Sequence, residues 1–499
     1  MQLAILTREQ MEMVHEASLR ILAEVGVHIP HADMRKRFRE AGAHVDEASG
    51  MVRIPAKLVE ESIAQAGKSF TIYGRDRSRK AVFGEGKRNY NSISGEALWI
   101  DDTPRGGEIR APDTPRGGGI GAPAPPRGER RWATLEDVVS AARLGDALPH
   151  LSIVGAMADP HELPASYRCV EVTAALLRNT TKPIGLWYHD RASARFLNEL
   201  FVALAGSEEE AAAYPVTYPF LEPISPLRFP HHGIDLLYET ARLNLPVPIG
   251  PMVQAGMSGP VTLAGTVAQE GAEILAGVCI TQLIRPGMPV CYGGIPHAFD
   301  MCTTQMVFCG PEQALMAIAL TQMGKQRYGL PVYINVGLTD SKSVDAQAGM
   351  ETGITLVCGA LAGADIFGHL GICGVDQATS LDMLVMQHEL IGFVERIMKG
   401  MRVDEEALAV EVIKEVGSGG SFIAHEHTLA HYREELWFPR LLDRRFYDAW
   451  AESGGSTMGE RCRREKERLL AEHQVEPLPE DIEQEFQRIT QRARKHLAP

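Results

Sequence analysis

The 499-residue chain has the composition of an ordinary globular protein, with 45% hydrophobic and 23% charged residues, and it carries a formal net charge of −14 at pH 7. This acidic balance argues against nucleic acid or an anionic membrane as the main partner, because both require a basic face. The eight cysteines are scattered singly, which is typical of a reducing compartment. We therefore expect a cytoplasmic protein without a membrane span.

The first 133 residues differ in pattern from the rest of the chain. Hydrophobic periodicity predicts amphipathic helices at about 7–25 and 31–42. Short strand-like pieces follow at 51–54, 69–73 and 88–92. Acidic residues interrupt the first helix at helical spacing, which is not the pattern of a signal peptide. We interpret residues 1–133 as an N-terminal α+β extension.

A Pro/Gly/Arg-rich tract at 102–131 repeats itself imperfectly, as DDTPRGGEIRAP and then DTPRGGGIGAP. Its composition leaves almost nothing to bury, so we expect a mobile loop or an expanded hairpin tip. Its arginines could contact a partner, but a duplication that a surface loop tolerates is the explanation we favour.

From Thr134 onward, short apolar stretches rich in β-branched residues alternate with longer helical patterns. This alternation predicts a parallel sheet with crossover helices. Eight units indicate a closed (β/α)8, or TIM, barrel at 134–431, although an open doubly wound sheet begins in the same way. The expected strands lie at 151–158, 183–189, 215–221, 246–253, 289–294, 331–337, 365–370 and 420–424. Residues 432–499 are helical and charged, and we expect them to be solvated or to contact another subunit of a homo-oligomer.

Aromatic residues and glycines recur where the expected strands end, which is where barrel enzymes carry out their reactions. A fixed organic cation without hydrogen-bond donors is held by π faces and dispersion, so these rings fit such a ligand. A plain hydrophobic rim would give the same pattern. Clustered glycines allow a bulky, flat ligand to approach the backbone closely. No phosphate-binding or nucleophile-elbow motif lies in a suitable strand–helix context.

The His425-Glu426-His427 triplet follows the last expected strand. An H-x-H pair on a strand can direct both imidazoles to one side and bind zinc, as in metal-dependent barrel hydrolases. Those enzymes usually place the pair on an early strand, and no further set of ligands is evident in this sequence. Hydrogen bonding to a substrate or to the barrel lip is the role we favour, and we assign no metal.

Three stretches resemble the trimethylamine methyltransferase family. They are INVGLTDSKSVDAQAGMETG (334–353), GGSFIAHEHTLAHYREELWFPRLLDR (419–444) and RWATLEDVVSAARLGDALPHL (131–151). The chain looks most similar to the branch without pyrrolysine, which includes glycine betaine–corrinoid methyltransferases. This resemblance implies a (β/α)8 barrel that passes a methyl group to cob(I)alamin, a corrinoid carried on a separate partner protein. The tract at 102–131 departs from the pattern of the family.

The resemblance also implies a quaternary amine as the methyl donor. The segment that corresponds to the pyrrolysine region, 304–310 (TQMVFCG), contains only standard residues. Removal of a methyl group from a quaternary ammonium releases a neutral tertiary amine, so the protein mainly has to position the substrate and exclude water. We therefore name no certain catalytic residue.

Positions for the two ligands follow from the strand ends together with this resemblance. We expect the ammonium among the rings of Tyr188, Phe220, Tyr292 and Phe308. We expect a substrate carboxylate to meet backbone N–H groups or the side chains of His297, Asn335 and His369. We expect the corrinoid to contact glycine-rich loops at Gly256, Gly293, Gly294 and Gly371.

Two other functions stay open. One is a metal-dependent TIM-barrel hydrolase that uses the His425/His427 pair, and stoichiometric zinc in the purified protein would favour it. The other is a non-catalytic subunit that binds betaine or corrinoid and gives no demethylation with cob(I)alamin.

Overall fold

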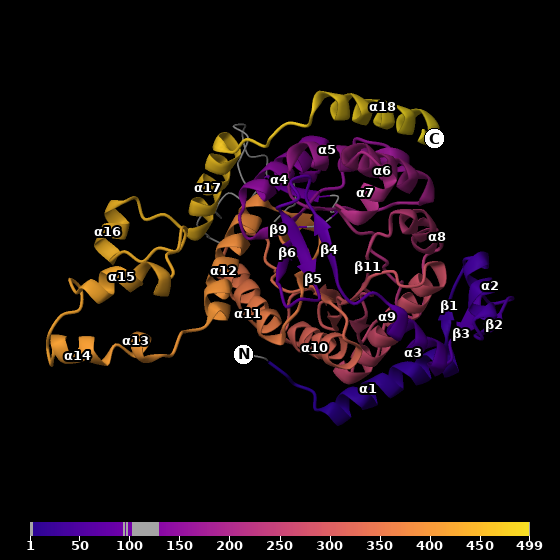
Figure 1. Cartoon of the computed structure of the whole chain (residues 1–499), viewed down its shortest axis with the longest axis horizontal. Coiled ribbons are helices and arrows are strands. Elements are labelled where there is room, and N and C mark those ends of the chain that lie inside the picture. Colours follow the sequence, from indigo (N-terminus) through magenta and orange to yellow (C-terminus); the bar gives the residue numbers. More distant parts are fainter. Residues whose placement is uncertain (1–2, 93–94, 96–97, 102–128, 499) are drawn as a thin grey trace, which may run out of the picture.

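Seven parallel strands at the centre of the molecule curl into a barrel, seen end-on in Figure 1. Their order in the sheet is β10 (Ile184–Gly185), β9 (Leu151–Gly155), β6 (Asn89–Asn91), β17 (Ile366–Phe367), β16 (Val332–Ile334), β13 (Val290–Gly294) and β11 (Val247–Ile249). Every neighbouring pair is parallel. The structure, a computed structural model, describes residues 3–92, 95, 98–101 and 129–498.

An extended segment at 215–221 fills the gap between the two edge strands of this sheet. The Ile184 N–H donates to the Val216 carbonyl oxygen at 2.9 Å, and the Leu221 N–H donates to the Pro248 carbonyl oxygen at 3.0 Å. Backbone hydrogen bonds on both sides of the segment therefore close the sheet into eight positions, as in a (β/α)8 barrel. The predicted barrel is confirmed.

The strand predicted at 420–424 is wrong. These residues are exposed and form no strand, and β6 takes the remaining barrel position between β9 and β17. The β6 sequence is Asn89-Tyr90-Asn91, in which two buried asparagines replace the β-branched apolar stretch that marks the other strands. The barrel sheet therefore draws one strand from the first 133 residues.

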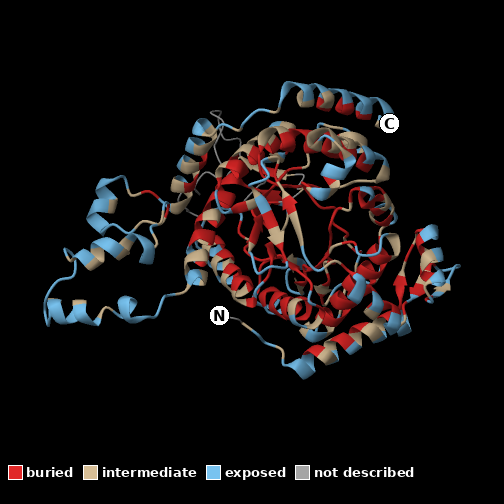
Figure 2. Ribbon diagram, viewed as in Figure 1, coloured by how far each residue is buried: buried red, intermediate tan, exposed pale blue. Residues whose placement is uncertain are grey.

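Helices alternate with the strands and form the outer layer of the barrel, with their inner faces buried (Figure 2). In chain order they are α4 (Leu135–Ala147), α5 (Ala165–Asn179), α6 (Arg191–Ala205), α7 (Glu208–Ala213), α8 (His231–Thr240), η2 (Ala241–Leu243), α9 (Leu263–Ile284), α10 (Pro311–Gln322), η3 (Met323–Tyr328), α11 (Ala346–Ala362) and α12 (Leu381–Lys399). Helix α9 is long and apolar enough to cross a membrane, but 83% of its most apolar 18-residue stretch is buried in the protein. We therefore identify α9 as a core helix of the barrel.

A β-hairpin closes the amino-terminal end of the barrel. It pairs β4 (Phe70–Tyr73) with β5 (Lys80–Phe83), and its buried side chains join the cluster that fills the barrel interior. Phe83 lies edge-on to Tyr218 with 6.4 Å between ring centroids, and Ile153 belongs to the same cluster. Because this end is filled, a ligand reaches the interior from the carboxyl ends of the strands.

One buried carboxylate ties the hairpin to the barrel. Asp365 lies directly before β17, and its side chain accepts the Gly84 N–H at 2.9 Å and the Val332 N–H at 2.8 Å. Lys325 of η3 forms an ion pair with it at 2.8 Å. The hairpin, two barrel strands and the helical layer therefore meet at a single side chain that is fully buried.

Two small sheets follow the carboxyl ends of the barrel strands. One contains β12 (Gln254–Ala255), β14 (His297–Asp300) and β15 (Gln305–Val307). The other contains β18 (Ile372–Cys373), β19 (Ala378–Thr379), β7 (Leu98–Asp101) and β8 (Glu129–Trp132). The β7–β8 pair is antiparallel, with Asp101 opposite Glu129. Residues 102–128 of the predicted Pro/Gly/Arg loop fall between these two strands and lie outside the described residues.

The remaining elements pack outside the barrel or extend away from it. The N-terminal group is α1 (Arg8–Arg20), η1 (Ile21–Val25), β1 (Val27–His28), α2 (Ala32–Glu40), β2 (His44–Asp46), β3 (Met51–Arg53) and α3 (Ala56–Gln65), and it packs mainly on α9. Helix α17 (Met458–Glu472) packs on α12, and α18 (Glu480–Leu497) packs on α5 and α6. Four short helices extend outward (Figure 1): α13 (Glu405–Leu408), α14 (Val410–Val416), α15 (Glu426–Glu435) and α16 (Tyr447–Glu452).

The Asp365→Ala substitution should destabilise the fold. It leaves the partly buried Lys325 ammonium without its partner and removes the acceptor of two backbone N–H groups. Breaking a buried pair in this way costs about 3–5 kcal/mol. Urea unfolding followed by tryptophan fluorescence measures the loss. Glu24→Ala, which breaks the exposed ion pair with Arg20, is the control and should leave the curve unchanged. An equal effect of the two substitutions would contradict the role of Asp365.

Candidate active site

Four aromatic side chains meet at the open end of the barrel and form a closed ring of contacts. Between centroids, Trp187 lies 5.7 Å from Phe220, and Phe220 lies 5.2 Å from Tyr333. His369 completes the ring at 6.0 Å from both Tyr333 and Trp187. All four contacts are edge to face, with interplanar angles between 60° and 84°. We call these four residues the ring cluster.

The sequence around each ring explains its position. Tyr333 is the central residue of β16, and its neighbours Val332 and Ile334 pack outward. Because successive side chains of a strand point to opposite faces, Tyr333 points into the barrel. Glycine makes room for the rings, because a Cβ at Gly368 would overlap the Tyr333 hydroxyl. His369 follows β17 and adopts the left-handed backbone conformation, with φ at +66°. The ring cluster therefore depends on barrel closure and on special backbone positions.

Several buried polar atoms near the ring cluster have no hydrogen-bond partner in the described part of the chain. They include the Tyr333 hydroxyl, His369 Nε2, both amide atoms of Asn335 and both ring nitrogens of His297. Asn335 follows Tyr333 by two residues and therefore shares its inward direction. Each buried polar group left without a partner costs about 1–3 kcal/mol. Such atoms are free to bind a polar ligand or water.

Burial sets the protonation of the site. It lowers the pKa of His369 to about 4 and, with the nearby His369, lowers the pKa of His297 to about 3, so both imidazoles are neutral at pH 7. Burial also raises the pKa of Glu222 to about 7. Burial is the main reason that the pKa of Tyr333 is raised. The Glu222 carboxylate lies close enough to add to this increase. The site therefore places an acid that titrates near neutrality beside the ring cluster.

A cleft opens from the ring cluster toward α8. Trp187, Phe220 and Glu222 line its inner part together with Tyr188 and His189. The Cys169 side chain, and then the Ala165 carbonyl oxygen, which lies 2.9 Å from His189 Nδ1, raise the pKa of His189 to about 9. An imidazolium and a carboxyl group therefore face the same cleft at neutral pH.

The structure brings most of the predicted substrate residues to this end of the barrel. Phe220 and His369 belong to the ring cluster, and Tyr188 lines the cleft with a buried, unpartnered hydroxyl group. His297 stacks on Phe308, with 4.7 Å between centroids and an interplanar angle of 24°. Phe308 packs in a separate apolar cluster with β18, so it is not one of the four rings.

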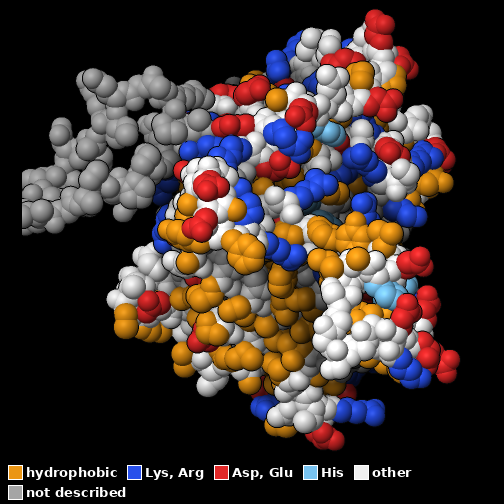
Figure 3. Space-filling view, turned by 90° about the vertical axis from the view of Figure 1, so that its left-hand side faces the viewer, with side chains coloured by type: hydrophobic (Ala, Val, Ile, Leu, Met, Phe, Trp, Pro, Cys, Tyr) orange, Lys and Arg blue, Asp and Glu red, His pale blue; other side chains and the backbone are white. Residues whose placement is uncertain are grey.

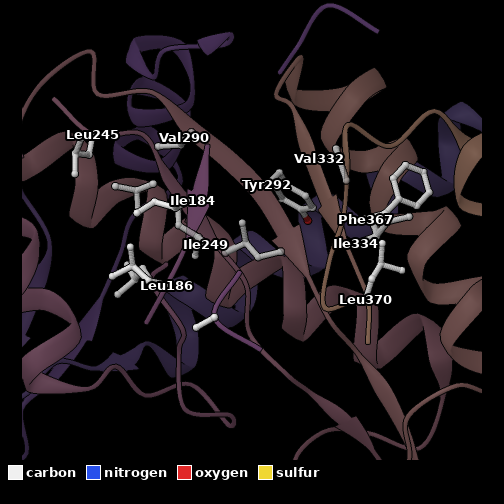
Figure 4. Packing of buried hydrophobic residues seen from close by; sticks show 14 of the residues in the cluster. Ile184, Leu186, Leu245, Ile249, Val290, Tyr292, Val332, Ile334, Phe367 and Leu370 are labelled. Carbon is white, nitrogen blue, oxygen red and sulfur yellow. The ribbon is translucent and has the colours of Figure 1, made fainter. Parts of the chain in front are cut away.

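Tyr292 does not face the barrel interior, which corrects the prediction for this residue. Figure 4 shows it among side chains of the main hydrophobic core, and its ring lies 5.3 Å from that of Tyr328. A Cβ at Gly271 of α9 would lie 3.2 Å from its hydroxyl oxygen. Side chains alternate along a strand, so on β13 the neighbouring Cys291 points into the barrel.

The glycines predicted to contact the corrinoid are closely approached by atoms of the chain itself. A Cβ at Gly293 would lie 2.9 Å from the Ile249 carbonyl oxygen, and one at Gly294 would lie 2.6 Å from the Leu320 side chain. A Cβ at Gly371 would overlap Met157, and one at Gly256 would lie 2.8 Å from Met301. These glycines therefore allow close packing within the protein, and their contact with a corrinoid stays a prediction.

His425 and His427 do not lie on a barrel strand, which corrects their expected placement at the mouth. His425 precedes α15 and its Nδ1 accepts the His427 N–H at 3.0 Å. The two residues belong to the outward-extending helices, and His427 lies beside His431 at 4.4 Å between centroids. The hydrolase alternative therefore loses the position on which it depended.

Trp187 and Glu222 lie at the ends of the strands expected at 183–189 and 215–221, but they are not among the predicted site residues. Tyr333 and the charge of His189 are also missing from the prediction. Tyr333 lies inside a strand, and only the alternation Val-Tyr-Ile-Asn at 332–335 could have identified its inward direction. The pKa values of Glu222 and His189 depend on burial and on neighbours from other elements. No local motif records such neighbours.

The fold and the site define a class of protein: a (β/α)8 barrel with an aromatic cluster and a partly buried carboxyl group at its mouth. The model of the trimethylamine methyltransferase (MTTB) family matches residues 1–106 and 121–498. The chain belongs to this family and is a methyltransferase of the methylamine or betaine type. The stretch that the family model omits, 107–120, lies within the repeated Pro/Gly/Arg tract.

Similar proteins agree with this membership. The glycine betaine methyltransferase of Desulfitobacterium hafniense (strain Y51) is 30% identical over 494 residues, which is 98% of this chain and 97% of that protein. The trimethylamine methyltransferase MttB of Methanosarcina thermophila is 30% identical over 516 residues, covering 97% and 96%. The solved Methanosarcina barkeri monomethylamine methyltransferase (MtmB) shares the fold at a TM-score of 0.52 and 10% identity, covering 99% of this chain and 88% of its own.

Replacing Glu222 by Gln should make stability less dependent on pH. Burial raises the pKa of Glu222 from 4.5 to about 7, so the folded state favours the protonated carboxyl group. The stability that this preference contributes is complete below pH 4.5 and is lost as the pH rises through 7. The melting temperature of the wild type, measured by calorimetry, should therefore fall more between pH 5 and pH 8 than that of E222Q. Glu24→Gln, on the exposed surface, should follow the wild type. Parallel curves for wild type and E222Q would refute the raised pKa.

Proposed function

We propose that this methyltransferase demethylates a quaternary amine of the glycine betaine type and passes the methyl group to cob(I)alamin on a separate corrinoid protein. The observation that carries the proposal is the ring cluster at the open end of the barrel. Membership of the family supports methyl transfer, and the similarity to a glycine betaine methyltransferase supports the class of donor.

The ring cluster suits the ammonium end of the donor. A quaternary ammonium has no N–H to donate, so π faces and a nearby carboxylate are the groups that attract it. Trp187, Phe220 and Tyr333 supply the rings, and Glu222 supplies the carboxylate. A permanent cation beside Glu222 favours its ionised form, so donor binding itself creates the countercharge at pH 7.

The carboxylate end of a betaine requires hydrogen-bond donors elsewhere at this end of the barrel. His189 is cationic at neutral pH, because its pKa is raised to about 9. The buried Asn335 amide has no other partner among the described residues and can donate an N–H. His297 and His369 are neutral at pH 7, so each can donate a hydrogen bond but supplies no charge. We assign the substrate carboxylate to His189, which lines the cleft beside Trp187, and name the buried Asn335 as the alternative donor.

The proposed reaction transfers a methyl group in line between two nucleophiles. The C–N bond breaks, its electron pair stays on nitrogen, and a neutral tertiary amine leaves. Cob(I)alamin supplies the attacking electron pair. No proton moves, so the residues of the site contribute by orienting the donor and excluding water. The filled amino-terminal end of the barrel restricts the approach to the mouth.

A tertiary amine donor fits this site less well. At neutral pH its leaving group requires activation, which the resemblance assigns to pyrrolysine in other members of the family. The corresponding segment, 304–310, runs along β15 to the start of α10 and contains only standard residues. Its Phe308 stacks on the neutral His297. We therefore infer a quaternary donor and not trimethylamine.

Incubation with cob(I)alamin and a panel of donors tests the proposal. We expect the methyl-cobalt absorption spectrum with at least one of glycine betaine, carnitine and choline, and none with trimethylamine. Betaine binding without any spectral change would identify a non-catalytic subunit instead. Turnover of trimethylamine alone would contradict the argument from the leaving group.

Phe220→Ala is the matched test of the site in the same assay. Losing one ring contact removes about 1–2 kcal/mol of cation–π attraction, so kcat/KM should fall about 5–30-fold. Tyr292→Phe alters an aromatic residue outside the barrel interior and should remain within about twofold of the wild type. Equal activity of Phe220→Ala and wild type would remove the ring cluster from the account.

A further inference from the structure

An apolar arm leaves the barrel between α12 and α17. We define the arm as residues 401–452, which contain α13 to α16, and none of these four helices has a buried residue. Twelve of the twenty-five large exposed apolar side chains in the described chain lie on the arm, which is about a tenth of the sequence. They are Met401, Val403, Leu408, Val410, Ile413, Phe422, Ile423, Leu429, Leu436, Phe438, Phe446 and Tyr447. Ile423 is 86% exposed and Phe446 is 91% exposed, and single soluble chains rarely gather so many exposed apolar side chains in one segment.

A second apolar surface lies on the barrel next to the arm. Met350 and Ile354, one turn apart on α11, are each 58% exposed. Phe393 and Ile397, one turn apart on the neighbouring α12, are 43% and 36% exposed. We call these four residues the wall. Figure 3, which views the molecule from the side of the arm, shows hydrophobic side chains gathered over this face.

The arm is anchored at its root, where its Trp437 covers part of Phe393, and it leaves the rest of its own wall exposed. Arg396 of α12 donates to the Glu435 carbonyl oxygen at 3.0 Å, and the Trp437 ring lies 5.4 Å from that of Phe393. Beyond this root, α13 and α14 extend outward from α12 (Figure 1). The wall residues and the arm residues therefore remain exposed together in a single chain, and covering them requires another molecule.

The position of the arm favours a second copy of this chain over the corrinoid partner. Arg88, directly before β6, pairs with Glu395 near the end of α12 at 2.6 Å. Helix α12 therefore ends at the amino-terminal end of the barrel, which is opposite the mouth. A corrinoid must reach the mouth, whereas the arm begins at the other end and extends sideways.

We propose that two copies associate by exchanging arms, with the arm of each copy lying over the wall of the other. The arm and the wall lie on the same side of the chain, so one twofold axis covers both surfaces in both copies and leaves no open end. The contact is apolar, as in obligate homodimers. Both barrel mouths stay free for substrate and partner.

Sedimentation equilibrium of the full-length protein tests this pairing. The wild type should have about twice the chain mass of 54.6 kDa. An arm variant, Ile423→Glu with Phe446→Glu, and a wall variant, Met350→Glu with Ile354→Glu, should each have half the wild-type mass. Met13→Glu changes a 68% exposed side chain on α1 and should keep the wild-type mass. Calorimetry must show that each variant retains a cooperative unfolding transition.

Mixing the two variants separates arm exchange from other contacts. The wall variant has an unchanged arm, and the arm variant has an unchanged wall. In a mixed pair these two unchanged surfaces can meet, so one of the two contacts stays intact. The mixture should therefore recover dimers that neither variant forms alone. A monomeric wild type, unchanged masses of both variants, or a mixture that stays monomeric would overturn the proposal. An arm variant that keeps its mass but loses methyl transfer to the corrinoid protein would assign the arm to that partner and would also overturn it.

Discussion

In the part of the chain that the structure describes, the amino-terminal end of this barrel is filled, and this constraint decides where chemistry can take place. The β4–β5 hairpin fills the amino-terminal end with Phe83 and its neighbours, and Asp365 fixes that hairpin to two strands and to the helical layer. The inward side chains that lie beyond this filling, Tyr333 and Asn335 among them, can be reached only from the carboxyl ends of the strands. The ring cluster and the cleft both lie there.

The site combines features that oppose stability elsewhere in a protein. Unpartnered atoms of His297 and Asn335 are buried, and burial pushes the pKa of Glu222 to about 7. Such groups persist because the large surrounding core holds them in place. Under the proposed function, each becomes favourable when a zwitterionic donor binds, since the cation of the donor would meet rings and a carboxylate while its carboxylate would meet N–H donors. The cost in the free protein therefore prepares the site for its ligand.

The sequence alone was sufficient for the fold class and insufficient for the geometry of the site. Alternation of strands and helices predicts the barrel. The polar β6 strand falls within the strand-like piece predicted at 88–92, but without an apolar pattern it is assigned to the N-terminal extension, and residues 420–424 take its barrel position in the prediction. The inward direction of Tyr333 and the outward direction of Tyr292 depend on strand register, which a list of strand ends does not contain. The ring cluster draws on four segments that are separated in the sequence, so its closure and the pKa of Glu222 emerge only in three dimensions.

The central claim is that the barrel mouth recognises the positive charge of a quaternary ammonium and not only its shape. Isothermal titration of glycine betaine and of 3,3-dimethylbutanoate tests it directly, because the second compound has the same shape and carboxylate with carbon in place of the charged nitrogen. Cation–π attraction and the Glu222 carboxylate should make betaine bind at least about 10-fold more tightly at pH 8. Equal affinities would contradict the account.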